Sequence, residues 1–426
     1  MARAVGADVR RKDGDAKVTG AAKYVDDLTF PGMIYGATIR STIPRGRIRQ
    51  RQVALPDAFI VADYRDIPGP NYVALIDPDQ PCLAVDEIRH AAEPIMLVGH
   101  ADKHALIDID KRITIGYDAL EPNYDAERSG VSFKNIAIDK GDIDRGFADA
   151  DFVVEGEYRT GHQEQLYIET NGVIAVPGDG EMTVYGSLQC PYYVHKALVV
   201  LLDLPPDRVR VVQAETGGGF GGKEEYPSML ACHAAILARK ANRPVKMIYD
   251  RVEDMLATTK RHPSIVRHRT GVKKDGRITA MDVDVILDGG AYGSYGTAST
   301  FYTGALQTVT YAVENYHFRG ARLFTNKAPC GPKRGHGTVQ PRFALEVQLD
   351  KIACDLKLDP AQMRLDNLAP RESLTANFLR IGSMGLAQCI HKVVDGSGWK
   401  TRRGKREKTA DGRIRGLGIA CSSYLS

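Results

Sequence analysis

The chain has 426 residues, 43% of them hydrophobic and 26% charged, which excludes a disordered or fibrous protein and indicates a folded globular one. At about 100–200 residues per domain, this length predicts two or three domains. The 57 basic and 53 acidic side chains leave a formal net charge of +4. Over so long a chain, that excess is too small to predict nucleic acid or an anionic membrane as the main partner.

Targeting and metal-binding signals are sparse in this sequence. Its longest apolar run, residues 197–202, is far shorter than the roughly 20 residues of a membrane-spanning helix. Charged residues follow Arg10 and Arg11 where a leader peptide would become apolar. The seven cysteines include no CxxC pair, which excludes the common cysteine-only zinc and iron–sulfur spacings. We therefore expect a cytoplasmic protein with no membrane partner.

The first part of the chain predicts a small mixed α/β domain at residues 1–125. Short apolar runs alternate there with proline and glycine, as at Pro31-Gly32 and Pro68-Gly69-Pro70. The polar, turn-rich stretch 123–142 is the expected boundary, and residues 126–426 form the second predicted domain.

The middle of the chain has clearer periodicity. We expect a hairpin, a helix that Pro205-Pro206 would end, a strand, a buried helix and a further strand. In chain order these predicted elements are the hairpin 173–185, helix 193–202, strand 209–212, helix 228–240 and strand 245–249.

The last part predicts a strand at 281–285 with one solvated face and an amphipathic helix at 345–356. Asp359-Pro360 is typical of a helix N-cap followed by proline at the first helical position. Residues 416–421 resemble the start of a buried strand shortly before the chain stops at Ser426. This pattern has two interpretations, an edge strand covered by a partner chain or a frayed terminus.

The most unusual segment is a glycine cluster, Thr216-Gly217-Gly218-Gly219-Phe220-Gly221-Gly222-Lys223-Glu224. So many glycines increase the conformational entropy that the backbone loses on folding. Their presence therefore indicates a close backbone approach or a positive φ. The cluster lies between a predicted strand and a predicted helix, where backbone N–H groups can hold an anion.

Three interpretations of the cluster stay open from the residues alone. Gly217, Gly219 and Gly222 match the GxGxxG pattern of dinucleotide-binding folds, and Asp250 ends the next predicted strand. The spacing also fits a P-loop, but Glu224 occupies the position where a serine or threonine should hold Mg²⁺. The third interpretation is a structural loop, which does not explain the Lys-Glu pair.

Several motifs, in the same order, resemble the molybdenum-binding large subunits of the xanthine oxidase family. The segments that carry this resemblance are 18–27 (VTGAAKYVDD), 93–94 (EP), 162–171 (HQEQLYIETN), 187–189 (SLQ), 217–224 (GGGFGGKE), 250–255 (DRVEDM), 260–263 (KRHP) and 333–337 (KRGHG). They extend over essentially the whole chain.

The resemblance implies an α+β fold, with an N-terminal α/β-hammerhead domain followed by the first molybdopterin-binding domain. It also implies molybdenum held by a pterin dithiolene, in the cytosine dinucleotide form, with no protein side chain as a metal ligand. Large subunits of this family are longer, and nicotinate dehydrogenase divides the subunit between two chains. The resemblance therefore implies a second molybdopterin-binding chain, or a truncated one here, with 2Fe-2S and FAD on partner subunits.

Site residues carry over position by position. The resemblance makes Gln189 an amide donor to the apical oxo ligand of molybdenum, and the backbone amides of Gly218, Gly219 and Phe220 donors to its other ligands. Arg334 would lie beside the same centre.

The substrate side of the site also follows from the family. Phe220 would form a wall of the pocket, and Glu224, at the start of the helix, would orient the substrate. Glu164 and Glu169 could form a carboxylate pair, but strand spacing puts them on opposite faces, so at least one is expected to be structural.

His336 departs from the family pattern, because xanthine-type enzymes have phenylalanine there. No arginine lies between Tyr292 and His317, where those enzymes bind substrate with one. The segment 330–339 is more similar to 4-hydroxybenzoyl-CoA reductase, in which His336 could donate a proton to a leaving hydroxide. The expected substrate is a small aromatic or heteroaromatic compound, hydroxylated or reductively dehydroxylated. Alternatives are a purine-type dehydrogenase subunit, a dinucleotide-binding dehydrogenase and a subunit that binds without catalysing.

Overall fold

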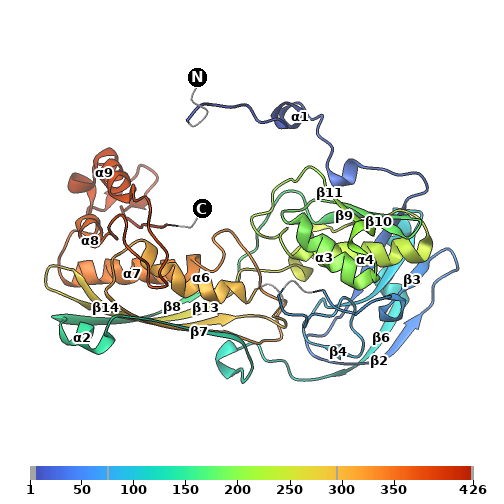
Figure 1. Ribbon diagram of the computed structural model, residues 1–426, viewed down its shortest axis with the longest axis horizontal. Helices are drawn as coiled ribbons and strands as arrows, with labels where there is room; N and C mark the ends of the chain where they lie inside the picture. The colour runs from blue at the N-terminus through green and yellow to red at the C-terminus, as the bar shows by residue number, and fades with distance from the viewer. Residues whose placement is uncertain (1–5, 74–75, 294–295, 424–426) are drawn as a thin grey trace. The chain divides into compact units, whose positions relative to one another are not determined.

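The computed structural model describes residues 6–73, 76–293 and 296–423 (Figure 1). Contacts within the chain group these residues into two compact units. Unit 1 comprises Met1–Pro122 and Glu164–Thr259, whereas unit 2 comprises Asn123–Gln163 and Lys260–Ser426. Each unit is therefore assembled from two separate stretches of the sequence.

Unit 1 is built on a mixed seven-stranded sheet whose strand order does not follow the chain. From edge to edge its strands are β11 (Val209–Gln213), β10 (Glu181–Gly186), β9 (Gly172–Gly178), β12 (Val245–Ile248), β1 (Ile34–Arg40), β5 (Pro94–His100) and β3 (Ile60–Ala62). The predicted hairpin is confirmed, because β9 and β10 pair antiparallel. Gly180 in its turn has a φ of +67°, which side-chain-bearing residues rarely adopt. β11 extends the sheet parallel to β10, so it places the start of the glycine cluster at one edge.

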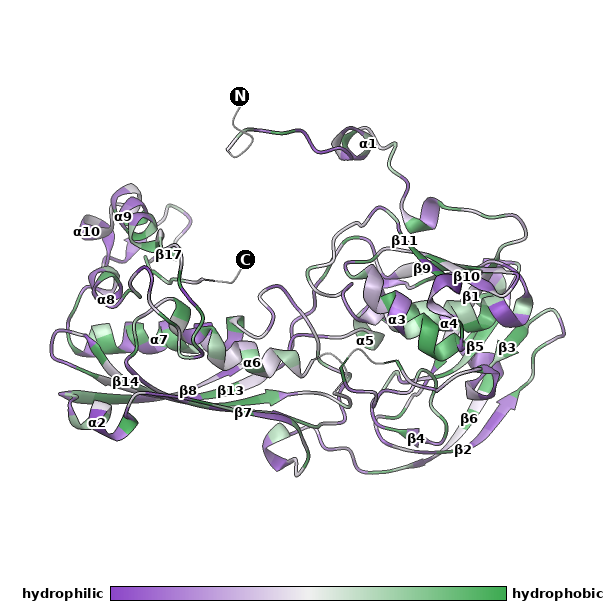
Figure 2. Cartoon of the chain, in the orientation of Figure 1, coloured by the Kyte–Doolittle hydropathy of each residue, from purple (hydrophilic) through white to green (hydrophobic). Residues whose placement is uncertain are grey.

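Two helices pack on this sheet, α3 (Pro191–Leu202) and α4 (Tyr226–Ala241) (Figure 1). Both predicted helices are thus confirmed. α4 is buried on every face from Tyr226 to Ala238, and Figure 2 shows how hydrophobic much of it is. It ends at Ala241, and the left-handed backbone of the next residue, Asn242, closes the last turn. A helix this enclosed is a rigid support for the loop that precedes it.

A smaller part of unit 1 is a three-stranded sheet of β4 (Glu87–Ile88), β2 (Gly46–Val53) and β6 (Ile113–Ala119). A separate hydrophobic cluster that includes Ile88 and Ile95 lies beneath it. Two short helices complete the unit, α1 (Gly14–Val18) and α5 (Arg251–Ala257).

Unit 2 is built on a five-stranded sheet. Its strands, in order, are β7 (Ser132–Lys140), β15 (Asn315–Leu323), β14 (Ile278–Asp288), β13 (Ser264–Val272) and β8 (Phe152–Thr160). Helices α6 (Ala298–Ala305) and α7 (Val339–Asp355) cover one face, and α2 (Ile143–Ala148) packs near β14 and β15 (Figure 1). Along β14, Val283 and Val285 are buried while Asp284 is exposed, which confirms the predicted one-sided strand.

Beyond α7 the chain forms smaller elements. They are α8 (Pro360–Asp366), α9 (Leu386–Ser397), α10 (Trp399–Arg402), β16 (Glu407–Lys408) and β17 (Ile414–Arg415). The predicted cap is confirmed, since the Asp359 carboxylate accepts the N–H groups of Ala361 and Gln362. The strand expected at 416–421 is wrong: within the described part of this tail, strand pairing stops at Arg415. Cys421 is anchored differently, by donating its N–H to the Glu346 carboxylate. Ser426 lies outside the described residues.

Separate sheets flanked by helices confirm the predicted α+β class. The division into domains at 1–125 and 126–426 stays a prediction. The contact-based units also begin to diverge near there, at Asn123, but they return 164–259 to unit 1. Among the helices of the described ranges, none has both the length and the hydropathy needed to cross a bilayer.

Candidate functional site

The glycine loop of unit 1 is held at both ends by side chains. At its start, Gly217 donates its N–H to Glu169 Oε2 over 2.7 Å. At its end, Gly221 and Lys223 donate theirs to Gln189 Oε1 over 2.9 and 3.2 Å. The backbone between these anchors has a positive φ at Gly218 (+93°), Phe220 (+50°) and Gly221 (+95°).

Three consecutive amides lie between the anchors, those of Gly218, Gly219 and Phe220. Among the residues that the structure describes, none accepts a hydrogen bond from these N–H groups. Successive amides in a backbone that alternates between left- and right-handed conformations form a concave anion-binding surface. These are the same three amides that the sequence predicted to face a ligand.

Gln189 follows β10 and precedes α3, and its side chain is exposed. Its backbone N–H donates to the Lys223 carbonyl over 2.7 Å, so main chain and side chain both tie it to the loop. Because Oε1 accepts two amides, Nε2 points away from them, and no described residue accepts its N–H groups. A Cβ on Gly219 would lie 2.3 Å from Oε1, so this contact requires glycine.

Phe220 carries the last of the three amides, and Glu224 follows it four positions later. Phe220 is 47% exposed, so it does not pack into the core beside Tyr226. Glu224 is half-buried, and burial raises the pKa of its carboxyl group. Its predicted position at the start of the helix is wrong, because α4 begins at Tyr226 and Glu224 lies in the turn before it.

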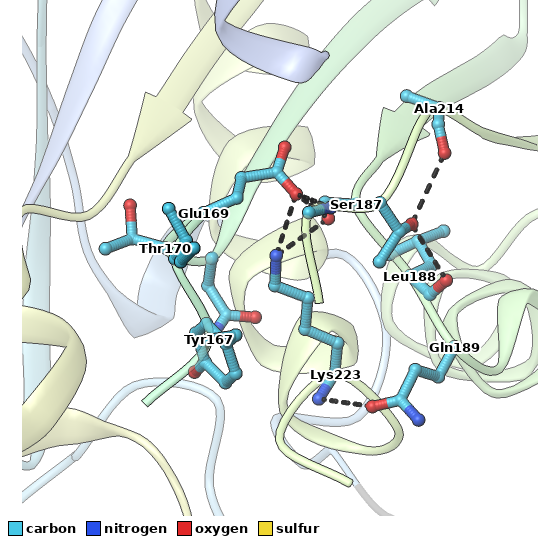
Figure 3. Close-up of polar contacts among 12 residues, drawn as sticks. Tyr167, Glu169, Thr170, Ser187, Leu188, Gln189, Ala214 and Lys223 are labelled. Carbon is cyan, nitrogen blue, oxygen red and sulfur yellow. Dashed lines mark hydrogen bonds and ion pairs between the residues drawn. The ribbon is translucent and has the colours of Figure 1, made fainter. Parts of the chain in front are cut away.

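Beneath the loop lies a buried ion pair that the sequence alone does not assign. Lys223 is fully buried, and its Nζ lies 2.9 Å from Glu169 Oε2 and 2.8 Å from Ser187 Oγ (Figure 3). Glu169 is structural, as expected of at least one of the two glutamates. The reason expected from strand spacing is wrong, however, because no strand forms at 164–169. The glycine cluster singles out Lys223, but no signal in the sequence pairs it with Glu169, 54 positions earlier.

In unit 2, the predicted site residues Arg334 and His336 lie on the loop before α7. The Arg334 side chain is exposed, and its carbonyl accepts from Arg261 Nη2 over 2.7 Å. Arg261 also donates to Gln163 Oε1 over 2.8 Å, so one buried guanidinium joins two loops. Gly335, between Arg334 and His336, has a φ of +83°, which allows the sharp turn there.

The His336 ring lies 5.6 Å from that of Tyr302, measured between centroids. Burial, reinforced by the positive charges of Arg261 and Arg322, lowers the pKa of His336 to about 4. In this chain the imidazole is therefore neutral at pH 7, and a role as proton donor requires a nearby negative charge to raise that pKa.

The structure brings the predicted residues together in two sets. Unit 1 carries Gln189, Gly218, Gly219, Phe220 and Glu224, and unit 2 carries Arg334 and His336. Within the described ranges, no three His, Cys, Asp or Glu side chains gather in a way that could hold a metal ion.

Two family models match the chain. Residues 19–121 match the model described as "Aldehyde oxidase and xanthine dehydrogenase, a/b hammerhead domain". Residues 126–368 match "Molybdopterin cofactor-binding domain".

Individual proteins agree with these matches. The chain is 33% identical over 398 residues to the nicotinate dehydrogenase large molybdopterin subunit of Eubacterium barkeri, covering 89% of this chain and 93% of that one. It is 32% identical over 400 residues to a probable xanthine dehydrogenase subunit of Bacillus subtilis, covering 90% of this chain but only 53% of the relative. The chain thus spans about half of the second relative and nearly all of the first.

Solved structures support the fold. The aldehyde oxidoreductase from Desulfovibrio gigas superposes with a TM-score of 0.87 at 23% identity, over 94% of this chain and 47% of that one.

Proposed function

Because the chain belongs to the xanthine oxidase family of molybdopterin-dependent oxidoreductases, we propose that it binds the molybdenum cofactor of an enzyme acting on a small aromatic or heteroaromatic compound. The observation that carries this proposal is the row of amides at Gly218, Gly219 and Phe220, which lack acceptors among the described residues. The adjacent Gln189 amide supplies a further donor.

The residues present fit such a group. The oxygen and sulfur ligands of a pterin-bound molybdenum are negatively charged acceptors, and this loop presents backbone donors with little side-chain bulk. When bound, the cofactor supplies two-electron redox chemistry with water as the source or acceptor of oxygen. The chain holds the group through the three amides and Gln189 Nε2, whose directions are fixed before binding.

Substrate would be oriented by the two side chains next to the amides. Exposed Phe220 offers a flat apolar wall, suited to stacking against an aromatic ring. Glu224 offers a carboxyl group with a raised pKa, so it can hydrogen-bond to ring heteroatoms or hydroxyls. Arg334 beside the metal centre and His336 in the substrate pocket stay proposals that rest on the family resemblance.

The proposed assembly includes a second molybdopterin-binding chain, an iron–sulfur subunit and an FAD subunit, in the cytoplasm. Supporting it, the Eubacterium relative is named a large molybdopterin subunit, whereas the Bacillus relative is almost twice as long as the matched segment. The cytosine dinucleotide form of the cofactor belongs to the same proposal.

The direction of reaction is proposed from His336. Phenylalanine at this position is a mark of the xanthine-type enzymes, so histidine disfavours a purine substrate. Reductive dehydroxylation, as in 4-hydroxybenzoyl-CoA reductase, needs a proton for the leaving hydroxide. In this proposal His336 is the candidate source of that proton, so a donor role favours reductive dehydroxylation and its absence favours hydroxylation.

A dinucleotide-binding dehydrogenase is not favoured. In a dinucleotide fold, the strands before and after the glycine-rich helix are neighbours. Here β11 and β12 flank α4 in sequence but are separated in the sheet by β10 and β9.

The test is to purify the native complex and measure molybdenum, pterin and nicotinamide per chain. We expect about one molybdenum and one pterin dinucleotide, with the loop of unit 1 against the metal ligands in a solved assembly. Bound nicotinamide without molybdenum would overturn the proposal.

A further inference from the structure

We propose that the buried ion pair between Lys223 and Glu169 is a positioning device that fixes both ends of the glycine loop and so aims the amides of Gly218, Gly219 and Phe220 at their ligand. The inference rests on the proposed function for the identity of that ligand. Whether the ion pair fixes the loop can be tested without knowing the identity of that ligand.

One carboxylate oxygen is the centre of the arrangement (Figure 3). Glu169 Oε2 accepts the Ser187 hydroxyl over 2.5 Å, the Gly217 N–H over 2.7 Å and the Lys223 ammonium over 2.9 Å. Gly217 begins the loop and Lys223 ends it. A single atom therefore sets the distance between the two ends.

The attraction between Lys223 and Glu169 is strong because the pair is largely shielded from water. The Lys223 side chain is fully buried, and the Glu169 side chain is 20% exposed. Burial lowers the pKa of Lys223, and Glu169 opposes this shift by stabilising the ammonium. Removing the carboxylate would leave a buried cation without its counter-ion, a change that proteins tolerate poorly.

Tyr167 packs against the ion pair. Lys223 Nζ lies 4.8 Å from the centroid of the Tyr167 ring, and the Tyr167 hydroxyl donates to buried Asp254 over 3.0 Å. A Cβ on Gly222 would lie 2.5 Å from the ring of Tyr167, so the loop rests directly on it. The loop is thus fixed from beneath while the three amides stay available.

This arrangement explains which amides are left for a ligand. Glu169 uses the N–H of Gly217, and Gln189 uses those of Gly221 and Lys223. The three amides between these anchors keep their direction without a ligand. Donors that need no reorganisation bind charge more effectively than mobile ones.

The experiment compares Glu169→Gln with Glu253→Gln in the full complex. Glu253 forms a partly buried ion pair of unit 1, with Arg40 at 2.9 Å, so its side-chain partner lies outside residues 216–224. Hydrogen exchange of the peptide covering 216–224 reports the loop, and molybdenum and pterin per chain report the ligand. Thermal unfolding reports overall stability.

We expect Glu169→Gln to speed exchange of the loop about 10-fold and to lower cofactor retention by about 10-fold, as for other supporting contacts of metal sites. Glu253→Gln should lower stability without either effect. Should Glu169→Gln fail to fold, Ser187→Ala removes one donor, keeps the ion pair and should give a smaller shift in the same direction.

The double variant Glu169→Gln/Lys223→Met removes both charges. It should recover part of the loop protection lost in Glu169→Gln, because no buried charge is left unpaired. Unchanged loop exchange in Glu169→Gln, or an equal effect of Glu253→Gln, would overturn the positioning role. A wild-type complex without molybdenum, but with faster loop exchange in Glu169→Gln, would instead contradict the proposed function and leave the positioning role supported.

Discussion

The side-chain oxygen of Gln189 lies 2.9 Å from the backbone nitrogen of Gly221, so a residue at the end of one sheet strand fixes a turn 32 positions later in the chain. Two amides, from Gly221 and Lys223, occupy the same oxygen. The glutamine amide therefore has a fixed orientation, with its nitrogen directed away from the loop. Under the proposed function, the oxygen of this amide group holds the loop and its nitrogen binds the ligand.

Because the oxygen and the nitrogen of the Gln189 amide have different roles, two substitutions of Gln189 should have different effects. Gln189→Glu keeps an oxygen for the two loop amides but replaces the Nε2 donor with a second, charged oxygen. We expect the loop to keep its structure and cofactor content to fall by about 10-fold or more, because the new charge repels anionic ligands. Gln189→Ala should lose both functions. Molybdenum analysis and hydrogen exchange of 216–224 separate the two, and equal cofactor content in Gln189→Glu and wild type would contradict the assignment.

Gly219 is expected to tolerate no side chain. The Cβ of Gly219→Ala would lie 2.3 Å from Gln189 Oε1 and 2.6 Å from its Cδ, so either the glutamine or the loop must move. Activity and cofactor content should both fall, by about 10-fold or more. Gly130→Ala is the matched control, since its Cβ meets no atom within 4 Å. If Gly219→Ala retains full cofactor content, the contact with Gln189 does not shape the site.

Local patterns predict several elements of the fold. The hairpin, helices α3 and α4 and the one-sided strand β14 all follow from periodicity and turn residues within about 20 positions. The tail at 416–421 shows the limit of such patterns. Its apolar residues suit a strand, but strand pairing depends on a neighbour that sequence periodicity does not report.

The site likewise combines features that can be predicted from the sequence with one that cannot. Clustered glycine predicts a backbone that approaches a ligand, and the family resemblance implies which amides, those of residues 218–220, would face it. The ion pair beneath them cannot be predicted, since Glu169 and Lys223 are 54 positions apart and meet only through the fold. The apolar pattern predicts the buried helix at 228–240, and α4 begins two residues earlier, at Tyr226, so Glu224 lies in the turn before it.

His336→Phe tests the histidine on the loop of unit 2. If His336 gives a proton to the substrate, turnover should fall about 100-fold while molybdenum is retained. The wild-type rate should then also decline as pH rises through the pKa of the ligand-bound histidine, and this limb should be absent in the variant. Tyr302→Phe keeps the ring beside His336 and should have nearly wild-type turnover. Unchanged turnover in His336→Phe rules out the donor role.

Acid should destabilise the chain before its carboxylates are protonated. Burial lowers the pKa of His233 and His268 to about 3, and that of His336 to about 4, below the ordinary value of 6.5. As pH falls below about 6.5, the unfolded chain binds these protons first, so the free energy of unfolding falls until the folded pKa values are reached. Each histidine contributes a slope of up to about 1.4 kcal/mol per pH unit.

Denaturant unfolding between pH 7 and pH 4.5 measures this slope. His268→Gln should make it shallower by about one proton, whereas His391→Gln, at an exposed position of α9, should leave it unchanged. An equal slope in His268→Gln and wild type would show that His268 is not held neutral by burial.

Substitution of Glu224 can distinguish an effect on substrate binding from an effect on the chemical step. The Glu224 carboxyl group is half-buried at the end of the glycine cluster, and no described residue donates a side-chain hydrogen bond to it. If it orients the substrate, Glu224→Gln keeps the shape and one acceptor but loses the charge, so KM should rise about 10-fold for substrates with a ring N–H or hydroxyl. Substrates that lack such a donor should be little affected, because they leave the carboxylate unused. Glu215→Gln, just before the glycine loop and paired with Lys17, is the matched control. A change in kcat alone, equal for both kinds of substrate, would instead place Glu224 in the chemical step, since the loss of an interaction made only in the transition state lowers kcat without changing KM.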